Sequence, residues 1–417
     1  MAQPHAATSI LELLTHPNPS VSHQKPKSTT NTRGRGWYCP VQIIKWDEFE
    51  DPKILEKMYG GDLLREAVCE GRNLGYYPSM HPQTDCNICN EDDTRDLIQK
   101  WNKTIVTAAL DPIQQQFHPV IWRKGDPPKG KEEHQLPKRR QAKERDQPVR
   151  KSTSKGRQPK KQSLSRLKPD SGSVLWIPPS IKADSITYRG ERFPKEYKPS
   201  SKWRSESLSE NELLDDSGEL FDFKTNNNHV WPIKQAYTYC IQHMCRYGCI
   251  LTCKEAFIFR VGPRKDKSFN GPQDADSLKH ELINDGLMEY ISIPWDNHNR
   301  NHKDRLDTWT INLALWFVHI LAGNNFEARW TYDSLIDEPL TVSTPLEDRA
   351  RPIVTPPISE ADQVERQEDD LEENVSVASQ ESDATNPFIS PTTKRKRHLD
   401  EDEEEGIYLS FSKRQLV

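Results

Sequence analysis

The chain has 417 residues, a net charge of -5 and 31 prolines, and its mean hydropathy is -0.88. Its hydrophobic fraction of 34% lies below the roughly 45–50% of ordinary globular domains, which excludes a chain that is packed throughout. The sequence therefore predicts one folded core of moderate size with long disordered segments, a basic middle and an acidic end.

Membrane and secreted proteins are disfavoured by the same sequence. No window of about 18 or more apolar residues is present, and residues 1–20 lack the basic and apolar regions of a secretory signal. The eight cysteines are not spaced like those of a small disulfide scaffold. Cys240, Cys245, Cys249 and Cys253 fall in a helix-strand segment, where a thiol serves as a small hydrophobe. These features predict an intracellular protein.

The elements before residue 123 are predicted from composition and periodicity. Residues 1–34 are rich in Ser, Pro, Thr and His and are predicted to be disordered. Residues 35–122 are predicted as the N-terminal helical part of the core, with a helix that begins near Glu91 and ends near Pro112. The apolar face of this helix comprises Leu97, Ile98, Trp101, Ile105, Ala108 and Ala109.

Two charged segments flank the main part of the core, which is predicted at 167–335. Residues 123–166 are strongly basic and are predicted to be a disordered linker or loop. Such a segment is equally compatible with a solvated tether and with salt-sensitive contact to nucleic-acid phosphates. Residues 340–417 are predicted to be a disordered acidic tail, in which Lys394–Arg397 resembles a nuclear-import patch.

The main part of the core opens with two strand patterns, at 173–177 and 193–198. The strongest periodicity runs from Trp231 to Arg260, where Ile233, Tyr237 and Ile241 indicate an amphipathic helix. Buried strands are predicted to follow it. The remaining predicted elements are strands at 249–252, 257–259 and 291–293, a polar insertion at 263–285, and a helix at 308–323 buried on more than one face.

An acid and a lysine two residues apart, Glu196 and Lys198, provide the clearest candidate chemistry. Residues i and i+2 of a strand share one face, so the carboxylate can bind a divalent ion while the ammonium orients water. Hydrolysis of a phosphodiester needs such an ion, and Mg²⁺ prefers carboxylate oxygens. Asp170 is the candidate second ligand. Gln235 opens the helix that follows, within reach of a phosphate or a water.

Other interpretations of these residues stay open. Asp222-Phe223-Lys224 has the same spacing as Glu196-Tyr197-Lys198, and an aspartate such as Asp170 is common in turns. Cys86 and Cys89 form a CxxC that would need Cys69 or His81 to bind zinc, and no second CxxC follows it. The chain has no Gly-rich phosphate loop and no Gly-x-Ser-x-Gly elbow, so NTPase and α/β-hydrolase functions lack support.

The order Pro169-Asp170, Glu196-Tyr197-Lys198 and Gln235 resembles the PD-(D/E)XK nuclease superfamily, which has a restriction-endonuclease-like fold. The chain is also similar to a large group of fungal proteins over roughly residues 90–120 and 167–330. The shared motifs stand here at Lys198–Trp203, Gln235–Cys240, Arg246–Thr252, Ile293–Trp295 and Trp309–Trp316.

This resemblance implies an α/β fold with a central mixed sheet flanked by helices, and a nuclease-like core at 167–335. It implies Asp170 and Glu196 as metal ligands and Lys198 as the water-positioning residue, and it favours Glu196 over Asp222. Two features depart from the family pattern. Pro178-Pro179 leaves open whether the two acids lie on adjacent strands, and Lys195 stands where such proteins often have a small residue.

We therefore expect a Mg²⁺- or Mn²⁺-dependent nuclease. Its expected substrate is nucleic acid, with DNA favoured, and its expected location is the nucleus. The alternative is a catalytically inactive module with the same fold, which binds nucleic acid or a protein partner. The sequence leaves the choice between DNA and RNA, the biological process and the oligomeric state open.

Overall fold

The structure is a computed structural model of the chain. It describes residues 7, 9–24, 29–34, 36–58, 63, 77–125, 127, 167–176, 190–266, 271–298, 306–338 and 340. The predicted basic linker beyond residue 127 lies outside the described residues, as does the predicted acidic tail beyond residue 340 with its Lys394–Arg397 patch. Within the described part of the chain, no helix has both the length and the apolar character that a bilayer crossing requires.

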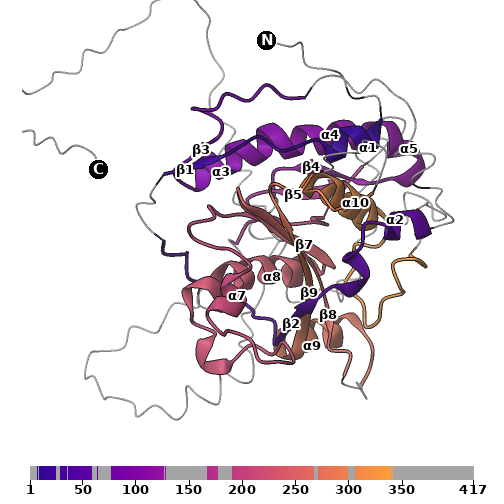
Figure 1. The fold of residues 1–417 in the computed structure, drawn as a ribbon. Helices are drawn as coiled ribbons and strands as arrows, with labels where there is room; N and C mark the ends of the chain where they lie inside the picture. The colour runs from indigo at the N-terminus through magenta and orange to yellow at the C-terminus, as the bar shows by residue number, and fades with distance from the viewer. Residues whose placement is uncertain are drawn as a thin grey trace, which may run out of the picture. The chain divides into compact units, whose positions relative to one another are not determined.

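A five-stranded mixed sheet forms the middle of the fold, with the strand order β2-β9-β8-β7-β6 (Figure 1). Its strands are β2 (Gln42–Lys45), β6 (Lys195–Tyr197), β7 (Tyr247–Leu251), β8 (Glu255–Pro263) and β9 (Gly286–Pro294). The pairs β6–β7 and β2–β9 are parallel, and β7–β8 and β8–β9 are antiparallel. Parallel neighbours need a crossover, and α8 (Trp231–His243) supplies it between β6 and β7.

A two-stranded hairpin adjoins the β6 edge of this sheet. Strands β4 (Val120–Arg123) and β5 (Gly172–Leu175) pair antiparallel. The backbone of Ser171, just before β5, exchanges hydrogen bonds of 2.8 and 3.2 Å with Lys195 of β6. The segment that follows Asp170 is therefore adjacent and antiparallel to β6. This answers the question raised by Pro178-Pro179, which themselves lie outside the described residues.

The sheet separates two apolar clusters, as alternation along a strand requires. Cys249 and Leu251 of β7 face the cluster that contains the helix α10 (Ile311–Asn324), whereas Ile250 between them faces the cluster that contains α8. The predicted buried helix at 308–323 is thus confirmed as α10. Its start is fixed by Thr310, whose hydroxyl accepts a hydrogen bond from the Leu313 N–H.

The helix predicted from Glu91 packs on α10 and is longer than expected. It comprises α3 (Glu91–Ile98), a π-helical stretch (Gln99–Lys103) and α4 (Thr104–Leu110). Instead of ending at Pro112, the chain continues through a 3₁₀ turn (Asp111–Ile113) into α5 (Gln114–Phe117). Proline is tolerated there because the first turn of a helix leaves its N–H groups unbonded.

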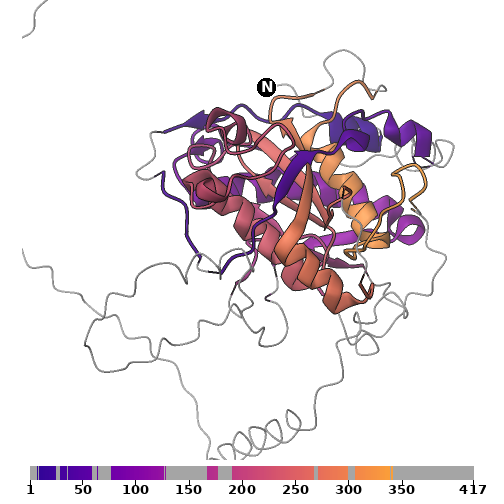
Figure 2. The ribbon, with the colours of Figure 1, turned by 90° about the horizontal axis from the view of Figure 1, so that it is seen from below.

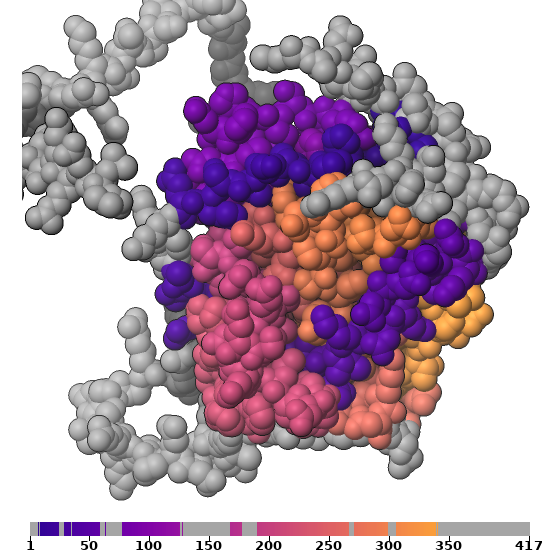
Figure 3. Space-filling view, viewed as in Figure 1, coloured from indigo at the N-terminus to yellow at the C-terminus, as the bar shows by residue number. Residues whose placement is uncertain are grey.

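Two regions predicted to lack regular structure contain helices. Within residues 1–34 the structure has α1 (Ile10–Thr15), whose leucines are buried, and β1 (Ser22–His23), which pairs with β3 (Asn87–Ile88). Figure 3 shows indigo N-terminal residues on the surface beside orange residues, and α1 contacts the buried helix α10. The Ser- and Pro-rich composition around Ile10–Thr15 concealed its short apolar face.

The predicted polar insertion at 263–285 contains α9 (Ala275–Asp285), capped by the Asp274 side chain. Only a narrow face of this helix is buried, through Leu278, Leu282 and Ile283, which is why its composition is polar. The strand expected at 291–293 is the end of the longer β9. Seen from below, α8 and α9 follow one another over the same face of the sheet (Figure 2).

Candidate metal centre

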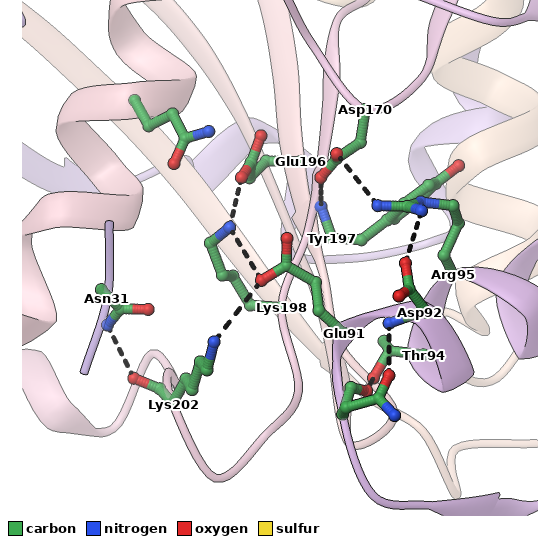
Figure 4. A network of polar contacts seen from close by, with 12 residues as sticks. Asn31, Glu91, Asp92, Thr94, Arg95, Asp170, Glu196, Tyr197, Lys198 and Lys202 are labelled. Carbon is green, nitrogen blue, oxygen red and sulfur yellow. Dashed lines mark hydrogen bonds and ion pairs between the residues drawn. The ribbon is translucent and has the colours of Figure 1, made fainter. Parts of the chain in front are cut away.

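Acidic side chains from three separate segments converge beside β6. Glu91, Asp170 and Glu196 each offer a carboxylate oxygen, and these oxygens all lie within 4.8 Å of one another. The ammonium of Lys198 lies 3.4 Å from Glu91 Oε2 and is hydrogen-bonded directly to Glu196 Oε1. Figure 4 shows the four side chains pointing toward one another. Of the four, Asp170, Glu196 and Lys198 were predicted from the sequence, and Glu91 was not.

Strand β6 positions Glu196 and Lys198 on a common face. Glu196 stands opposite Ile250 in the parallel register with β7, and the Lys198 N–H donates to the carbonyl of Leu251 at 3.0 Å. Asp170 is held from the opposite side, because its Oδ2 accepts a 2.9 Å hydrogen bond from the Tyr197 N–H. The backbone of one strand therefore orients all three predicted groups.

Glu91 reaches the cluster because it is the first residue of α3. Asn90 caps this helix by accepting hydrogen bonds from the N–H groups of Asp92 and Asp93, and Asp93 accepts in return from the Asn90 N–H. The sequence analysis attributed the acids at 91–93 to the helix N-terminus alone. The capping box fixes where the helix begins, but the distance from Glu91 to β6 is a property of the tertiary structure.

Burial shifts the titration of this cluster. Glu196 is 1% exposed and Lys198 is 3% exposed. Burial, reinforced by the Asp170 charge and opposed by Lys198, raises the pKa of Glu196 to about 8. Burial also raises the pKa of Asp170, against the hydrogen bond from Tyr197. Burial alone would lower the pKa of Lys198, but the charges of Glu196 and Glu91 outweigh it, so the pKa is raised.

Other cations border the acids on the solvent side. Arg95 of α3 lies 3.5 Å from Asp170, and Lys202 lies 3.8 Å from Glu91. Both side chains are partly exposed, at 35% and 24%, so water screens their pairing with the acids. Figure 4 shows them on either side of the cluster. The buried pair of Glu196 and Lys198 is thus surrounded by a more exposed ring of charges.

Gln235 contacts the cluster through an intermediate residue. Its Nε2 donates to the hydroxyl of Tyr239, one helical turn further along α8, at 2.8 Å. That hydroxyl lies 3.1 Å from Glu196 Oε2 and 3.1 Å from the Lys168 carbonyl oxygen. Gln235 is therefore placed to orient Tyr239, and Tyr239 to orient Glu196. The i, i+4 spacing of Gln235 and Tyr239 on one helix is the signal that could have identified Tyr239 from the sequence.

The rival acid-x-lysine sequence has a different setting. Asp222–Lys224 forms a 3₁₀ turn in place of a strand, and Phe223 between them is 76% exposed. The ammonium of Lys224 donates to the backbone carbonyls of Asn211 and Glu212. Because a 3₁₀ turn does not place residues i and i+2 on one face, Asp222 and Lys224 do not reproduce the arrangement around Glu196.

The CxxC does not belong to the group of side chains, among the described residues, that could hold a metal ion, which comprises Glu91, Asp170 and Glu196. Cys86 and Cys89 flank the short strand β3, and only Cys86 is buried. His81 begins a turn, with its N–H bonded to Asp85. Cys69, the other candidate zinc ligand, lies outside the described residues.

The donor set suits a hard divalent ion. Mg²⁺ binds oxygen at about 2.0–2.1 Å, which places two opposite ligands about 4.2 Å apart. The carboxylate oxygens of Glu91, Asp170 and Glu196 lie within 4.8 Å of one another, which is close to this spacing. Comparisons with protein-family models, curated proteins and solved structures gave no match.

Proposed function

We propose that this protein is a metal-dependent nuclease with a restriction-endonuclease-like core, which uses Mg²⁺ or Mn²⁺ to hydrolyse phosphodiester bonds. The observation that carries the proposal is the meeting of Glu91, Asp170 and Glu196 within 4.8 Å of one another beside the buried ammonium of Lys198. A carboxylate cluster with an adjoining ammonium provides both the ligands for an ion and a donor for a phosphate oxygen or a water.

The order of the elements supports the restriction-endonuclease-like assignment. The hairpin of β4 and β5 carries Asp170 at its edge, the adjacent β6 carries Glu196 and Lys198, and α8 with Gln235 leads to the parallel strand β7. A mixed sheet with helices on both faces is what the resemblance to the PD-(D/E)XK superfamily implies. This element order and this type of sheet support the proposed fold.

Each residue of the cluster has a role in the proposed reaction. A bound Mg²⁺ or Mn²⁺ would supply the Lewis acid that polarises the phosphate. Asp170 and Glu196 hold the ion, and Lys198 donates hydrogen bonds that position the attacking water or a phosphate oxygen. Tyr239 restrains the Glu196 carboxylate through their 3.1 Å contact. Glu91, with 31% of its side chain exposed, is accessible as an acceptor for the proton that the water loses.

The alternative, an inactive module of the same fold, is favoured by one specific observation. The acids already have protein cations as partners, since Lys198 bonds Glu196 and Arg95 pairs with Asp170. In an inactive relative these ion pairs would replace the divalent ion and stabilise the fold. The two proposals differ in whether added Mg²⁺ or Mn²⁺ displaces these contacts.

Cleavage assays with matched variants test the proposal. Plasmid DNA, single-stranded DNA and RNA are incubated with the purified chain, with Mg²⁺, Mn²⁺ or EDTA. We expect cleavage that needs the ion and is lost in Asp170→Asn, Glu196→Gln and Lys198→Ala. The control is Asp222→Asn with Lys224→Met, which alters the rival acid-x-lysine pair and should cut like the wild type. Equal cutting by the wild type and Lys198→Ala would identify a contaminant and refute the assignment.

DNA as the substrate and the nucleus as the location are parts of the same proposal. Both rest on sequence alone, namely on the basic residues 123–166 and on Lys394–Arg397. The RNA arm of the assay tests the first. The second is tested by imaging a fluorescent fusion in which Lys394–Arg397 are replaced by glutamine, which should lose nuclear accumulation.

A further inference from the structure

A cavity of about 610 Å³ adjoins the carboxylate cluster. Its volume falls within the roughly 300–1,000 Å³ of small-molecule sites. Two of its walls continue the segments that hold the cluster: Ile88 and Cys89 precede Glu91 in the chain, and residues 199–204 follow Lys198. Lys202 belongs to both places, since it lines the cavity and lies 3.8 Å from Glu91.

The cavity is lined by more cations than acids. Lys202, Arg204 and Lys254 contribute positive charge, and Glu210 is the acidic residue among the lining. Arg204 is partly neutralised by Glu206 at 3.0 Å and by Glu210 at 3.8 Å. Lys254 is exposed and forms no ion pair with another described residue. A cavity of this charge attracts an anion, and phosphate is the anion that the adjoining cluster is proposed to process.

The remaining lining supplies surfaces for a planar base. Ile88 and Pro199 are apolar, and His23 and His229 also line the cavity. Burial and the charge of Lys254 lower the pKa of His23, and burial lowers that of His229. Both rings are therefore mostly neutral at physiological pH, a state in which an imidazole can stack on a base or accept a hydrogen bond from it.

We propose that this cavity binds an unpaired nucleotide directly beside the phosphodiester held at the carboxylate cluster. The proposal deepens the proposed function and rests on it, because it assigns the substrate class: nucleic acid with a single-stranded segment at the point of cleavage. In a duplex the bases are stacked inside a convex cylinder, and only an unstacked nucleotide can insert its base into a pocket. Lys254 and Lys202 contact the flanking phosphates.

Binding measured in EDTA separates this proposal from catalysis. Fluorescence anisotropy follows the full chain with a labelled single-stranded oligonucleotide and with its blunt duplex, over a range of salt concentrations. We expect tighter binding of the single strand. For the Lys254→Gln variant binding the single strand, the plot of log K against log salt should become less steep by about 0.7. This is the value for one lost phosphate contact on a single strand.

The matched control is Lys57→Gln, because Lys57 is an exposed lysine of the helix α2 (Ile54–Lys57) that does not line the cavity. It should leave the slope unchanged. A readout without mutation is lysine acetylation followed by mass spectrometry, in which the oligonucleotide should protect Lys254 and Lys202 but leave Lys57 reactive. An unchanged slope in Lys254→Gln, unprotected Lys254, or equal affinity for the duplex would overturn the proposal.

The outcomes also separate the two proposals from each other. Binding that depends on Lys254, without cleavage in Mg²⁺ or Mn²⁺, would refute the nuclease and leave the cavity as a nucleotide-binding site. Suppose instead that cleavage needs Lys198 but that the salt dependence of oligonucleotide binding is the same in Lys254→Gln as in the wild type. The nuclease proposal would then stand, and the proposal that this cavity binds a nucleotide would be refuted.

Discussion

Strand β6 and the residue that follows it carry two lysines, Lys195 and Lys198, on opposite faces and in different environments. On one face, Lys198 contacts Glu196 and Glu91. On the other, Lys195 donates to the Ser173 hydroxyl at 2.5 Å and to the Phe193 carbonyl at 2.9 Å. Its ammonium also lies 4.1 Å from the centre of the Phe193 ring.

This difference in neighbours reverses the effect of burial. Both ammonium groups are desolvated, which disfavours the charged form. The pKa of Lys195 is lowered by burial to about 8, whereas neighbouring carboxylates raise the pKa of Lys198 despite its burial. Alternation along one short strand thus places one ammonium beside carboxylates that favour its charged form and the other where burial disfavours the charged form.

The largest contrast is expected in cleavage by Lys198→Met and Lys195→Met. Loss of a group that positions water or a phosphate oxygen should slow cleavage by about 10²–10⁴-fold in Lys198→Met. Lys195→Met should retain a rate within a few-fold of the wild type, because Lys195 faces the interior of the protein. Rates are measured on plasmid with Mg²⁺ and normalised to the folded fraction. A comparable loss in folded Lys195→Met would show that the two faces act as one unit.

The acidic face should make metal binding depend on pH, since an ion must displace the proton held by Glu196. Burial raises the pKa of Glu196 to about 8, so protons compete with the ion for this carboxylate across the neutral range. Apparent Mn²⁺ affinity should therefore rise about tenfold per pH unit up to that value and then level off. Isothermal titration calorimetry in buffers of different ionisation enthalpy measures both the affinity and the released proton. Affinity that is flat across this range would contradict the raised pKa.

Stability without metal should show the opposite pH trend. The folded state raises the pKa of Glu196 from 4.5 to about 8, so it binds this proton more tightly than the unfolded state does. The stabilisation is complete below about pH 4.5 and is lost as pH rises toward 8. In EDTA at about pH 9, Glu196→Gln should be more stable than the wild type by about 1–3 kcal/mol.

At about pH 5 that difference should disappear, because Glu196 is then protonated in the folded protein. Thermal unfolding followed by circular dichroism measures both conditions. Adding Mn²⁺ at the higher pH should stabilise the wild type and leave Glu196→Gln unaffected. A variant that is less stable than the wild type at both pH values would mean that the Glu196–Lys198 pair stabilises the fold more than desolvation opposes it.

The smallest effect is expected for the residues that orient Glu196 from α8. Tyr239→Phe removes the 3.1 Å contact with Glu196, and a hydrogen bond of this kind contributes about 0.5–1.5 kcal/mol. Cleavage should fall by about threefold to tenfold, through kcat more than KM. Gln235→Leu should also lower the rate of cleavage, but by less, because Gln235 acts through Tyr239. A larger loss in Gln235→Leu than in Tyr239→Phe would instead place Gln235 in direct contact with the substrate.

Local sequence determined the elements that hold the site. The i, i+2 relation of Glu196 and Lys198, the helix periodicity after Trp231, and the apolar helix that ends near Gly323 follow from alternation and spacing within short windows. Elements with little apolar surface escaped prediction: α9 buries three side chains, and α1 is a short helix within a Ser- and Pro-rich segment. In both, composition over a longer window masked a local pattern.

Only the tertiary structure decided which acids meet. Glu91 joins Glu196 across 105 residues of sequence because α3 packs beside β6, and Asp170 joins it through the backbone bridge of Ser171 and Lys195. Asp222-Phe223-Lys224 shares the spacing of Glu196-Tyr197-Lys198, yet it folds as an exposed 3₁₀ turn. Spacing sets the face of a strand on which a residue stands, whereas burial and the neighbours that fold against it set its charge state and its chemistry.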